Sequence, residues 1–257
     1  MPHQSLFEFT GTIGPSELVP PIRATYRLQR PEGTVTVDVE EYVVRLRFAA
    51  TYESFDDLYY QIVEFVLAFF AVGTINTGIA VELQLDEWTE TPLDRVDAEG
   101  MTHRVRGQIL HRDPDAIPPV LLPEDYTFGL ARGIQWSQEI ATNAFFRRAL
   151  LDFNHALKHS LNDVPIYLAR SIESTQNFFG GEEALISSLS VSNEVKLVKR
   201  LANDAMAGLH TRHAARTEAM TSVTRDQVLA AIDAVRSVLL KFQIHISDQP
   251  SDQGPLE

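Results

Sequence analysis

The sequence predicts an α+β protein, with an N-terminal antiparallel sheet and one long helix followed by a C-terminal all-α antiparallel helix bundle. In residues 5–50, short runs of β-branched and aromatic residues alternate apolar with polar positions, and Pro or Gly separates the runs. This alternation is typical of strands with one buried face. In residues 136–246, apolar residues instead recur every three or four positions, as they do on one face of an α-helix.

The composition is typical of an intracellular globular protein. The 257 residues are 44% hydrophobic, which is enough for a substantial core in one large domain or two small ones. Because the chain has no cysteine, disulfides, thiolate zinc sites and a cysteine nucleophile are excluded. The N-terminus lacks the cationic start and apolar run of a secretory signal, so we expect a cytoplasmic protein. The net charge of −13 argues against broad attachment to nucleic acid or anionic lipid.

The front half is expected to form the sheet and its helix. Ser54 is a suitable cap for a helix over residues 55–72, and Gly73 is expected to end that helix. The apolar run from Phe65 to Val81 is short and contains polar residues, so it predicts a buried helix followed by a strand and no membrane segment. The expected strands span residues 5–13, 21–30, 34–40, 42–50, 79–88 and 103–110.

A proline-rich stretch is expected to divide the chain. Residues 113–126 contain four prolines and few helix or strand signals, which is typical of a linker. Residues 1–135 hold 10 Lys and Arg against 21 Asp and Glu, whereas residues 136–257 hold 12 against 14, so the front half carries most of the negative charge. We expect an α+β sensor or partner domain at 1–125, a helical bundle at 130–246 and a disordered tail at 247–257.

Amphipathic helices with short connections predict the antiparallel bundle of the back half. Pro165 follows Asn162 and Asp163, and this group is expected to stop one helix and start the next. Thr224 and Gln227 match a capping box, which marks the start of the last helix. The expected helices span about 136–161, 165–179, 182–189, from 192 onward, and 224–246.

The segment from Glu194 to Arg216 is the first candidate site. From Lys196 onward it carries five cations against one acid, Asp204, and two histidines, in an otherwise acidic protein. Such a cluster can hold a phosphate through charge-assisted hydrogen bonds, while a histidine moves a proton near neutral pH. A solvated helix face would explain the same pattern. The candidate phosphate-binding residues are Lys196, Lys199, Arg200 and Arg216, and His210, Arg212 and His213 lie beside them.

Residues 136–246, less than half of the chain, resemble the HEPN superfamily, the higher-eukaryote and prokaryote nucleotide-binding helical domain. The likeness rests on the run FFRRALLDFNHAL, on the helix IYLARSIESTQNFF with an acid at Glu173, on the Arg-His pair in RHAAR, and on the closing helix VTRDQVLAAIDAVRSVLLKF. The resemblance implies RNA or a nucleotide as the ligand and host defence or toxin-like RNA restriction as the context. It also implies a homodimer formed through these helices.

The ribonuclease members of this family resemble one another in a motif of Arg, a polar residue and, four to six residues later, His. Arg212 and His213 match the first two positions, but residues 217–219 are Thr, Glu and Ala where the final histidine is expected. For RNA cleavage, the resemblance implies that Arg212 neutralises the phosphate, that His213 or His210 carries the proton and that Glu173 orients the histidine. No metal or cofactor is expected for this reaction.

Three other interpretations remain open. Arg148 and His155 have the spacing Arg-x6-His inside one expected helix, where residues seven apart share a face. His155, His159, His210 and His213 could meet in the bundle as the zinc ligands of a metal-dependent hydrolase. The acidic front domain could instead bind a protein partner while the bundle serves non-catalytic assembly. P-loop, dinucleotide-binding and serine-hydrolase motifs do not occur in the sequence.

Overall fold

The computed structural model describes residues 3–14, 22–77, 80–93, 105–108, 133–158, 163–214 and 223–248, without the side chains of residues 3, 22, 76, 77, 105–108 and 204–214. The chain forms two compact units, Met1–Thr142 and Asn143–Glu257. The expected linker at 113–126 and the expected tail from residue 249 lie outside the described residues. The second unit begins at Asn143, whereas the sequence places the start of the bundle near residue 130.

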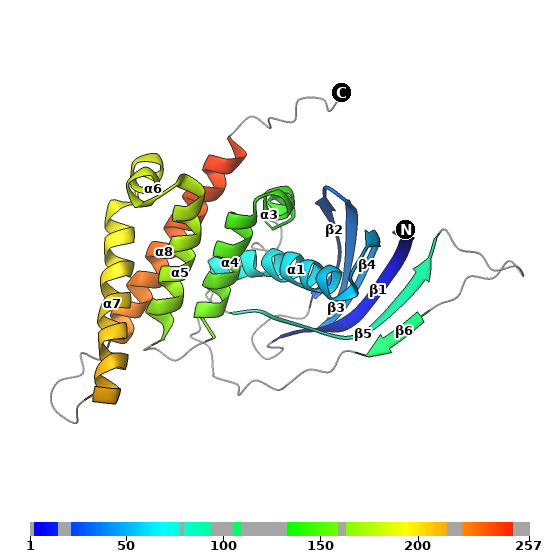
Figure 1. Cartoon of the computed structure of the whole chain (residues 1–257), viewed down its shortest axis with the longest axis horizontal. Helices are drawn as coiled ribbons and strands as arrows, with labels where there is room; N and C mark the ends of the chain where they lie inside the picture. The colour runs from blue at the N-terminus through cyan, green and yellow to red at the C-terminus, as the bar shows by residue number, and fades with distance from the viewer. Residues whose placement is uncertain are drawn as a thin grey trace, which may run out of the picture. The chain divides into compact units, whose positions relative to one another are not determined.

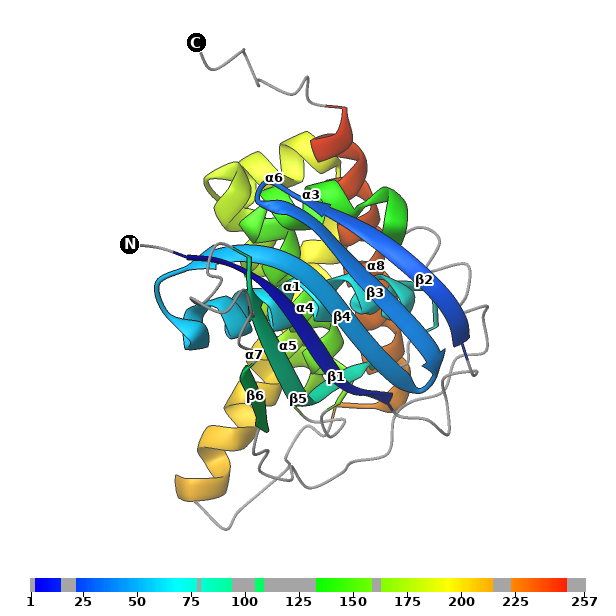
Figure 2. The same cartoon turned by 90° about the vertical axis from the view of Figure 1, so that its right-hand side faces the viewer.

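The first unit contains a six-stranded antiparallel sheet with the order β2-β3-β4-β1-β5-β6 (Figures 1 and 2). This confirms the expected fold class. Strands β2, β3 and β4 are consecutive in the sequence and adjacent in the sheet, whereas β1 is inserted between β4 and β5. The strands are β1 (His3–Gly14), β2 (Ile22–Arg30), β3 (Gly33–Glu41), β4 (Val43–Tyr52), β5 (Glu82–Pro92) and β6 (Val105–Gln108).

One face of the sheet is apolar and packs against helix α1 (Phe55–Thr77). Alternate residues of each strand point to this face, as the period of two requires. The ring of Phe55 lies 4.4 Å from that of Trp88 on β5, and the ring of Phe69 lies 5.1 Å from that of Tyr26 on β2, so α1 crosses the sheet. The buried apolar side chains of the strands are those of Phe7, Phe9, Ile13, Tyr26, Leu28, Val35, Val37, Val39, Val44, Leu46, Phe48 and Leu85.

Helix α1 continues past Gly73, so the expectation that this glycine ends the helix is wrong. A glycine inside a helix costs about 1 kcal/mol relative to alanine. Thr74 and Ile75 are buried on the following turn, and their packing offsets that cost. The stretch Phe55–Ile75 is long and apolar enough to span a membrane, but 67% of its most apolar part is buried inside the protein. Such burial is typical of the core helix of a soluble protein.

The helix expected from Trp136 to Leu161 is two helices, α3 (Ser137–Thr142) and α4 (Ala144–Ala156). Asn143 separates them because its Oδ1 accepts a hydrogen bond of 2.9 Å from the N–H of Phe146 and thereby caps α4. Helix α3 contacts β2 and α1, and thus belongs to the first unit.

The second unit is an antiparallel bundle in which α5 lies between α4 and α7, with α8 behind them (Figure 1). Thr224 and Gln227 form the expected capping box at the start of α8. Fully buried Phe146, Phe153 and Phe242 fill the core. After α4, the helices are α5 (Val164–Phe179), α6 (Glu182–Leu189), α7 (Ser192–Ala214) and α8 (Arg225–Ser247).

Candidate functional site

The predicted Arg-His pair lies in the last part of α7, where the structure describes only the backbone. Successive residues of an α-helix are about 100° apart around its axis. Positions 212 and 213 are therefore about 100° apart, and positions 210 and 212 about 200° apart, on nearly opposite sides of α7. The convergence of Arg212 with His213 or His210 stays a prediction, and Arg216 and His159 lie outside the described residues.

The described members of the predicted site lie on two helices, α5 and α7. Lys196 and Arg200 are exposed on α7, and Glu173 is exposed on α5. Lys199 is half-buried and its Nζ is bound to the carboxylate of Glu182 on α6. Lys199 therefore anchors α7 to α6 through an ion pair.

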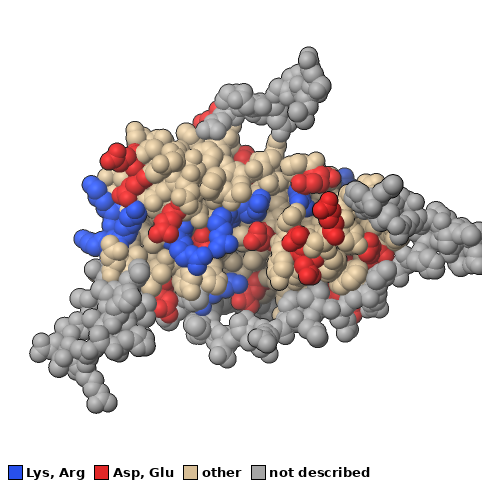
Figure 3. All heavy atoms as spheres, viewed as in Figure 1, with Lys and Arg blue, Asp and Glu red and all other residues tan. Residues whose placement is uncertain are grey.

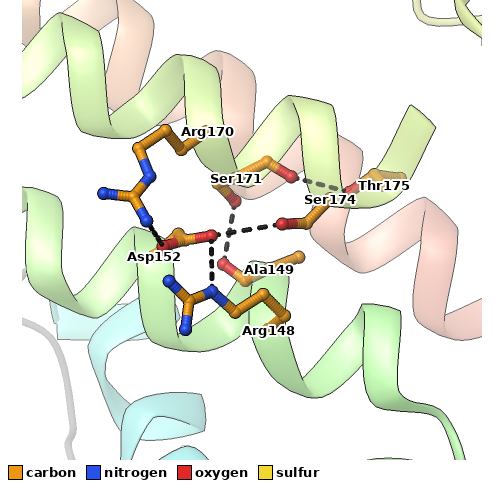
Figure 4. A network of polar contacts seen from close by, with 7 residues as sticks. All are labelled: Arg148, Ala149, Asp152, Arg170, Ser171, Ser174 and Thr175. Atoms are coloured by element: carbon orange, nitrogen blue, oxygen red, sulfur yellow. Dashed lines mark hydrogen bonds and ion pairs between the residues drawn. The ribbon is translucent and has the colours of Figure 1, made fainter. Parts of the chain in front are cut away.

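A different cation pair gathers around Asp152, whose side chain is 5% exposed (Figure 4). Arg148 Nε donates a hydrogen bond of 3.2 Å to Asp152 Oδ2, and Arg170 Nη2 lies 3.6 Å from Asp152 Oδ1. Ser174 Oγ on α5 donates a hydrogen bond of 3.1 Å to Asp152 Oδ2. In the view of Figure 4, Arg170 approaches the carboxylate from above and Arg148 from below, and we call Arg148, Asp152, Arg170 and Ser174 the Asp152 cluster.

Two rings extend the Asp152 cluster along the same surface. The guanidinium carbon of Arg170 lies 5.7 Å from the centre of the Tyr167 ring, in a cation–π contact. The ring of the exposed His155 meets the Tyr167 ring edge-on, with 4.7 Å between their centres. Two arginines, a tyrosine and a histidine are therefore contiguous on α4 and α5.

Helix geometry and close packing of α4 on α5 produce this arrangement. Arg148 and Asp152 are four residues apart on α4, as are Arg170 and Ser174 on α5, so each pair shares a helix face. The two helices meet at Ala149 and Ser171, where Ser171 Oγ donates a hydrogen bond of 2.9 Å to the carbonyl of Ala149. These small residues allow the close approach that brings Arg170 to Asp152.

The electrostatics of the Asp152 cluster favour an anion. A buried carboxylate requires partners, and Asp152 has two cations and one hydroxyl. The side chains of Arg148 and Arg170 are 50% and 45% exposed, so their other N–H groups face solvent. One negative charge is shared by two positive ones, which leaves a local charge of +1 at two guanidinium groups that each contact Asp152. Planar guanidinium groups of this kind bind phosphate oxygens in pairs.

Of these residues, the sequence singled out only Arg148 and His155, through their spacing. Asp152, Arg170, Ser174 and Tyr167 were not among the predicted site residues. The sequence does contain Arg and Asp four apart within FFRRALLDF, a pattern that can mark an ion pair on one helix face. The residues that α5 adds to the site depend on how α4 and α5 are aligned against each other. Spacing within the sequence does not predict that alignment.

The outer face of the sheet is polar and hollowed. The hollow has a volume of about 720 Å³, and Glu8, Asp38, Arg45, Arg47 and Glu87 are among the residues that line it. Asp38 accepts hydrogen bonds of 2.6 Å from Thr25 Oγ1 and from Arg47 Nη2. The hydrogen bond from Thr25, followed by the contact with Arg47, lowers the pKa of Asp38 below its ordinary value of 3.8.

No group of three or more His, Asp or Glu residues suited to a metal ion occurs among the described residues. His155 is the one member of the expected zinc set whose side chain is described, and its ring contacts Tyr167. Comparison with known protein families, with curated proteins and with solved structures finds no match to this chain. The chemistry of the site is therefore argued from its own geometry.

Proposed function

We propose that the second unit is a HEPN-like bundle that binds RNA and that the Asp152 cluster holds one of its phosphates. The observation that supports this most directly is that two half-exposed arginines share one buried carboxylate. Arg148 and Arg170 are ordered before any ligand arrives, so little side-chain entropy is lost on binding. Their N–H groups toward solvent then donate to phosphate oxygens, and Tyr167 offers an aromatic ring beside them.

Metal-independent RNA cleavage is the reaction that we propose for this site. It requires a base to take the proton of a 2′-hydroxyl and cations to stabilise the charged phosphate. Arg148 and Arg170 would supply the cations and His155 the proton acceptor in one arrangement. In the other, Arg212 and His213 or His210 act with Glu173, as the family resemblance implies. Either arrangement fits an intracellular, cytoplasmic role in RNA restriction.

The test of RNA binding uses two matched triple variants. Arg148→Gln, Asp152→Asn, Arg170→Gln removes all three charges of the Asp152 cluster and leaves no buried carboxylate unpaired. The control, Arg23→Gln, Glu40→Gln, Arg45→Gln, removes an exposed trio with the same charges on the sheet, where both arginines lie within 4 Å of Glu40. Fluorescence anisotropy with labelled RNA should show several-fold weaker binding for the first variant alone. Equal affinities for both variants would reject the Asp152 cluster as the phosphate site.

Cleavage is tested separately by incubating mixed RNAs with the protein in the presence of a chelator. His155→Ala and the double variant Arg212→Ala, His213→Ala distinguish the two arrangements, because only the variant that removes the acting residues should lose activity. Intact RNA with the wild-type protein rejects the metal-independent reaction. Activity that chelator abolishes would favour the metal-dependent hydrolase.

A homodimer formed through the helices is part of the proposal, because it would place two basic sites around a two-fold axis. Light scattering coupled to size-exclusion chromatography measures the molar mass in solution. A mass of twice 28.8 kDa is the expected result. A mass of 28.8 kDa at all concentrations would contradict the dimer.

The second candidate function is a non-catalytic interaction module. The hollow on the outer face of the sheet favours it, because that face presents acidic and basic side chains from four neighbouring strands. Under this alternative the first unit binds a protein partner and the bundle serves assembly. If the control variant Arg23→Gln, Glu40→Gln, Arg45→Gln binds RNA as well as wild type does, the outer face of the sheet is not part of the RNA site.

A further inference from the structure

We infer that the RNA bound by the second unit is an extended single strand that runs from α4 over α5 to α7. This inference rests on the proposed function and names the form of its ligand. Besides the Asp152 cluster, the same face of the unit carries a second group of cations over the first turns of α7 (Figure 3). A ligand with several phosphates can contact both groups, whereas one free nucleotide cannot.

The second group contains two cations whose charge is available to a ligand. Lys196 and Arg200 are exposed and four residues apart, so they share one face of α7. Neither makes an ion pair or hydrogen bond within the described part of the chain. The neighbouring Lys199 and Lys241 differ, since they pair with Glu182 and Glu194.

The spacing of the helices sets the length of this surface. Helix α5 contacts both α4 and α7, and packed helices lie about 8–10 Å apart, so α4 and α7 are at most about 16–20 Å apart. That distance suits an oligonucleotide of about four nucleotides or more. A typical double-stranded-RNA-binding domain contacts about 16 base pairs across two minor grooves, which is longer than this face. Tyr167 and His155 at the α4 end offer rings to unpaired bases, which a duplex keeps stacked inside.

Exposed Glu173 gives the inference a second test. It follows Arg170 by three residues and so lies on the same side of α5, the helix that contacts both α4 and α7. A polyanion that crosses α5 is repelled by this carboxylate. Glu173→Gln should therefore increase the affinity for single-stranded RNA, and an unchanged or lower affinity would count against this path.

The main experiment measures the affinity of the full chain for a labelled single-stranded RNA of 12 nucleotides at several salt concentrations. Wild type is compared with Lys196→Gln, Arg200→Gln and with the control Arg23→Gln, Arg45→Gln, which removes two exposed arginines from the sheet. The plot of log affinity against log salt falls by about 0.7 per phosphate contact for a single strand. We expect the Lys196 and Arg200 variant to bind several-fold more weakly with a slope shallower by about 1.4. The control should keep the wild-type slope.

The other measurements separate this inference from the proposed function. Unlabelled AMP should compete poorly with the 12-nucleotide strand, and the same strand annealed to its complement should bind more weakly than the free strand. Equal slopes for wild type and the Lys196 and Arg200 variant, or equal binding of duplex and single strand, overturn the path over α7. In that case binding that still depends on Arg148 and Arg170 leaves the phosphate site standing. No binding of either RNA overturns both proposals.

Discussion

Asp152 shows how one buried carboxylate can set the chemistry of a surface. Charged groups are rarely buried without partners, because the loss of hydration is not otherwise compensated. Asp152 is compensated by two arginines whose far ends remain in solvent. The ion pairs therefore have two effects: they compensate the cost of burying the carboxylate, and they orient Arg148 and Arg170. A variant without the Asp152 charge therefore tests whether Arg148 and Arg170 bind RNA because Asp152 orders them or only because they are positively charged.

Asp152→Asn should weaken RNA binding several-fold although it makes the protein more positive by one charge. The reason is that Arg148 and Arg170 lose the anion that orders them, and their ordering entropy is then lost on binding. The control is Glu40→Gln, which removes the acid from the exposed trio with Arg23 and Arg45 and should leave the affinity unchanged. Anisotropy titrations measure both. A higher affinity for Asp152→Asn would mean that the arginines act by charge alone.

Tyr26 predicts a loss of stability at alkaline pH. Its burial raises the pKa of the phenol above the ordinary value of 10.0. The folded state therefore keeps the proton at a pH where the unfolded chain has released it, so the free energy of unfolding falls as pH rises above 10. Denaturant titrations between pH 8 and about 11.5 should show this fall, and Tyr26→Phe should reduce it. The same pH dependence in Tyr26→Phe would assign the loss to Tyr52 and Tyr59, whose pKa values burial also raises.

At the scale of elements, the sequence predicted those strands and helices whose positions depend on local periodicity and capping residues. Alternating residues in β3 and β4 and the capping box of α8 act locally, and all three elements formed where they were expected. Tertiary packing decided the exceptions. Burial of Thr74 and Ile75 carried α1 through Gly73, and the side chain of Asn143 started a new helix inside an apolar pattern that looked continuous.

The contact between β1 and β5 depends on the absence of a side chain at Gly11. The register between these strands shifts at Thr10 and Gly11. A Cβ atom at Gly11 would lie 1.9 Å from the carbonyl oxygen of Gln84, and backbone cannot yield as a flexible side chain does. Gly11→Ala should therefore lower the free energy of unfolding by about 3 kcal/mol or more.

Gly180→Ala is the matched control for Gly11→Ala. Gly180 has a φ of 80°, and a Cβ atom added there would meet no other atom within 4 Å. The only cost of alanine at this position is its less favourable backbone conformation at positive φ, which should lower the free energy of unfolding by about 1 kcal/mol. Urea titrations followed by circular dichroism compare the two variants. A similar loss in both would mean that β1 and β5 can move apart at Gly11 without much cost.

At the scale of the whole molecule, the candidate site is the part that sequence predicts least. Arg148 and His155 were visible because they lie on one helix, where spacing defines a face. Arg170 comes from a second helix, and its position against Asp152 depends on the packing of Ala149 and Ser171. Contacts between two helices depend on how their surfaces are aligned when they pack. A single sequence indicates that alignment only indirectly, through the small residues that allow close approach. The predicted pair at 212 and 213 stays a prediction.

The two units each contain a core of their own, and we expect them to unfold as separate cooperative units. Both tryptophans, Trp88 and Trp136, belong to the first unit, so tryptophan fluorescence reports on that unit alone. Circular dichroism at 222 nm reports mainly on the helical second unit. Leu46→Ala and Leu150→Ala each remove a fully buried side chain, one in each unit, and should each cost about 2–5 kcal/mol.

Leu46→Ala should therefore lower the thermal midpoint seen by fluorescence, while the main transition at 222 nm and the RNA affinity at 20–25 °C stay close to wild type. Leu150→Ala should do the reverse, because α4 and the Asp152 cluster belong to the second unit. If both probes shift together in both variants, the units unfold as one. The first unit would then contribute to the stability of the RNA site, and its hollow outer face could not be treated as independent of RNA binding.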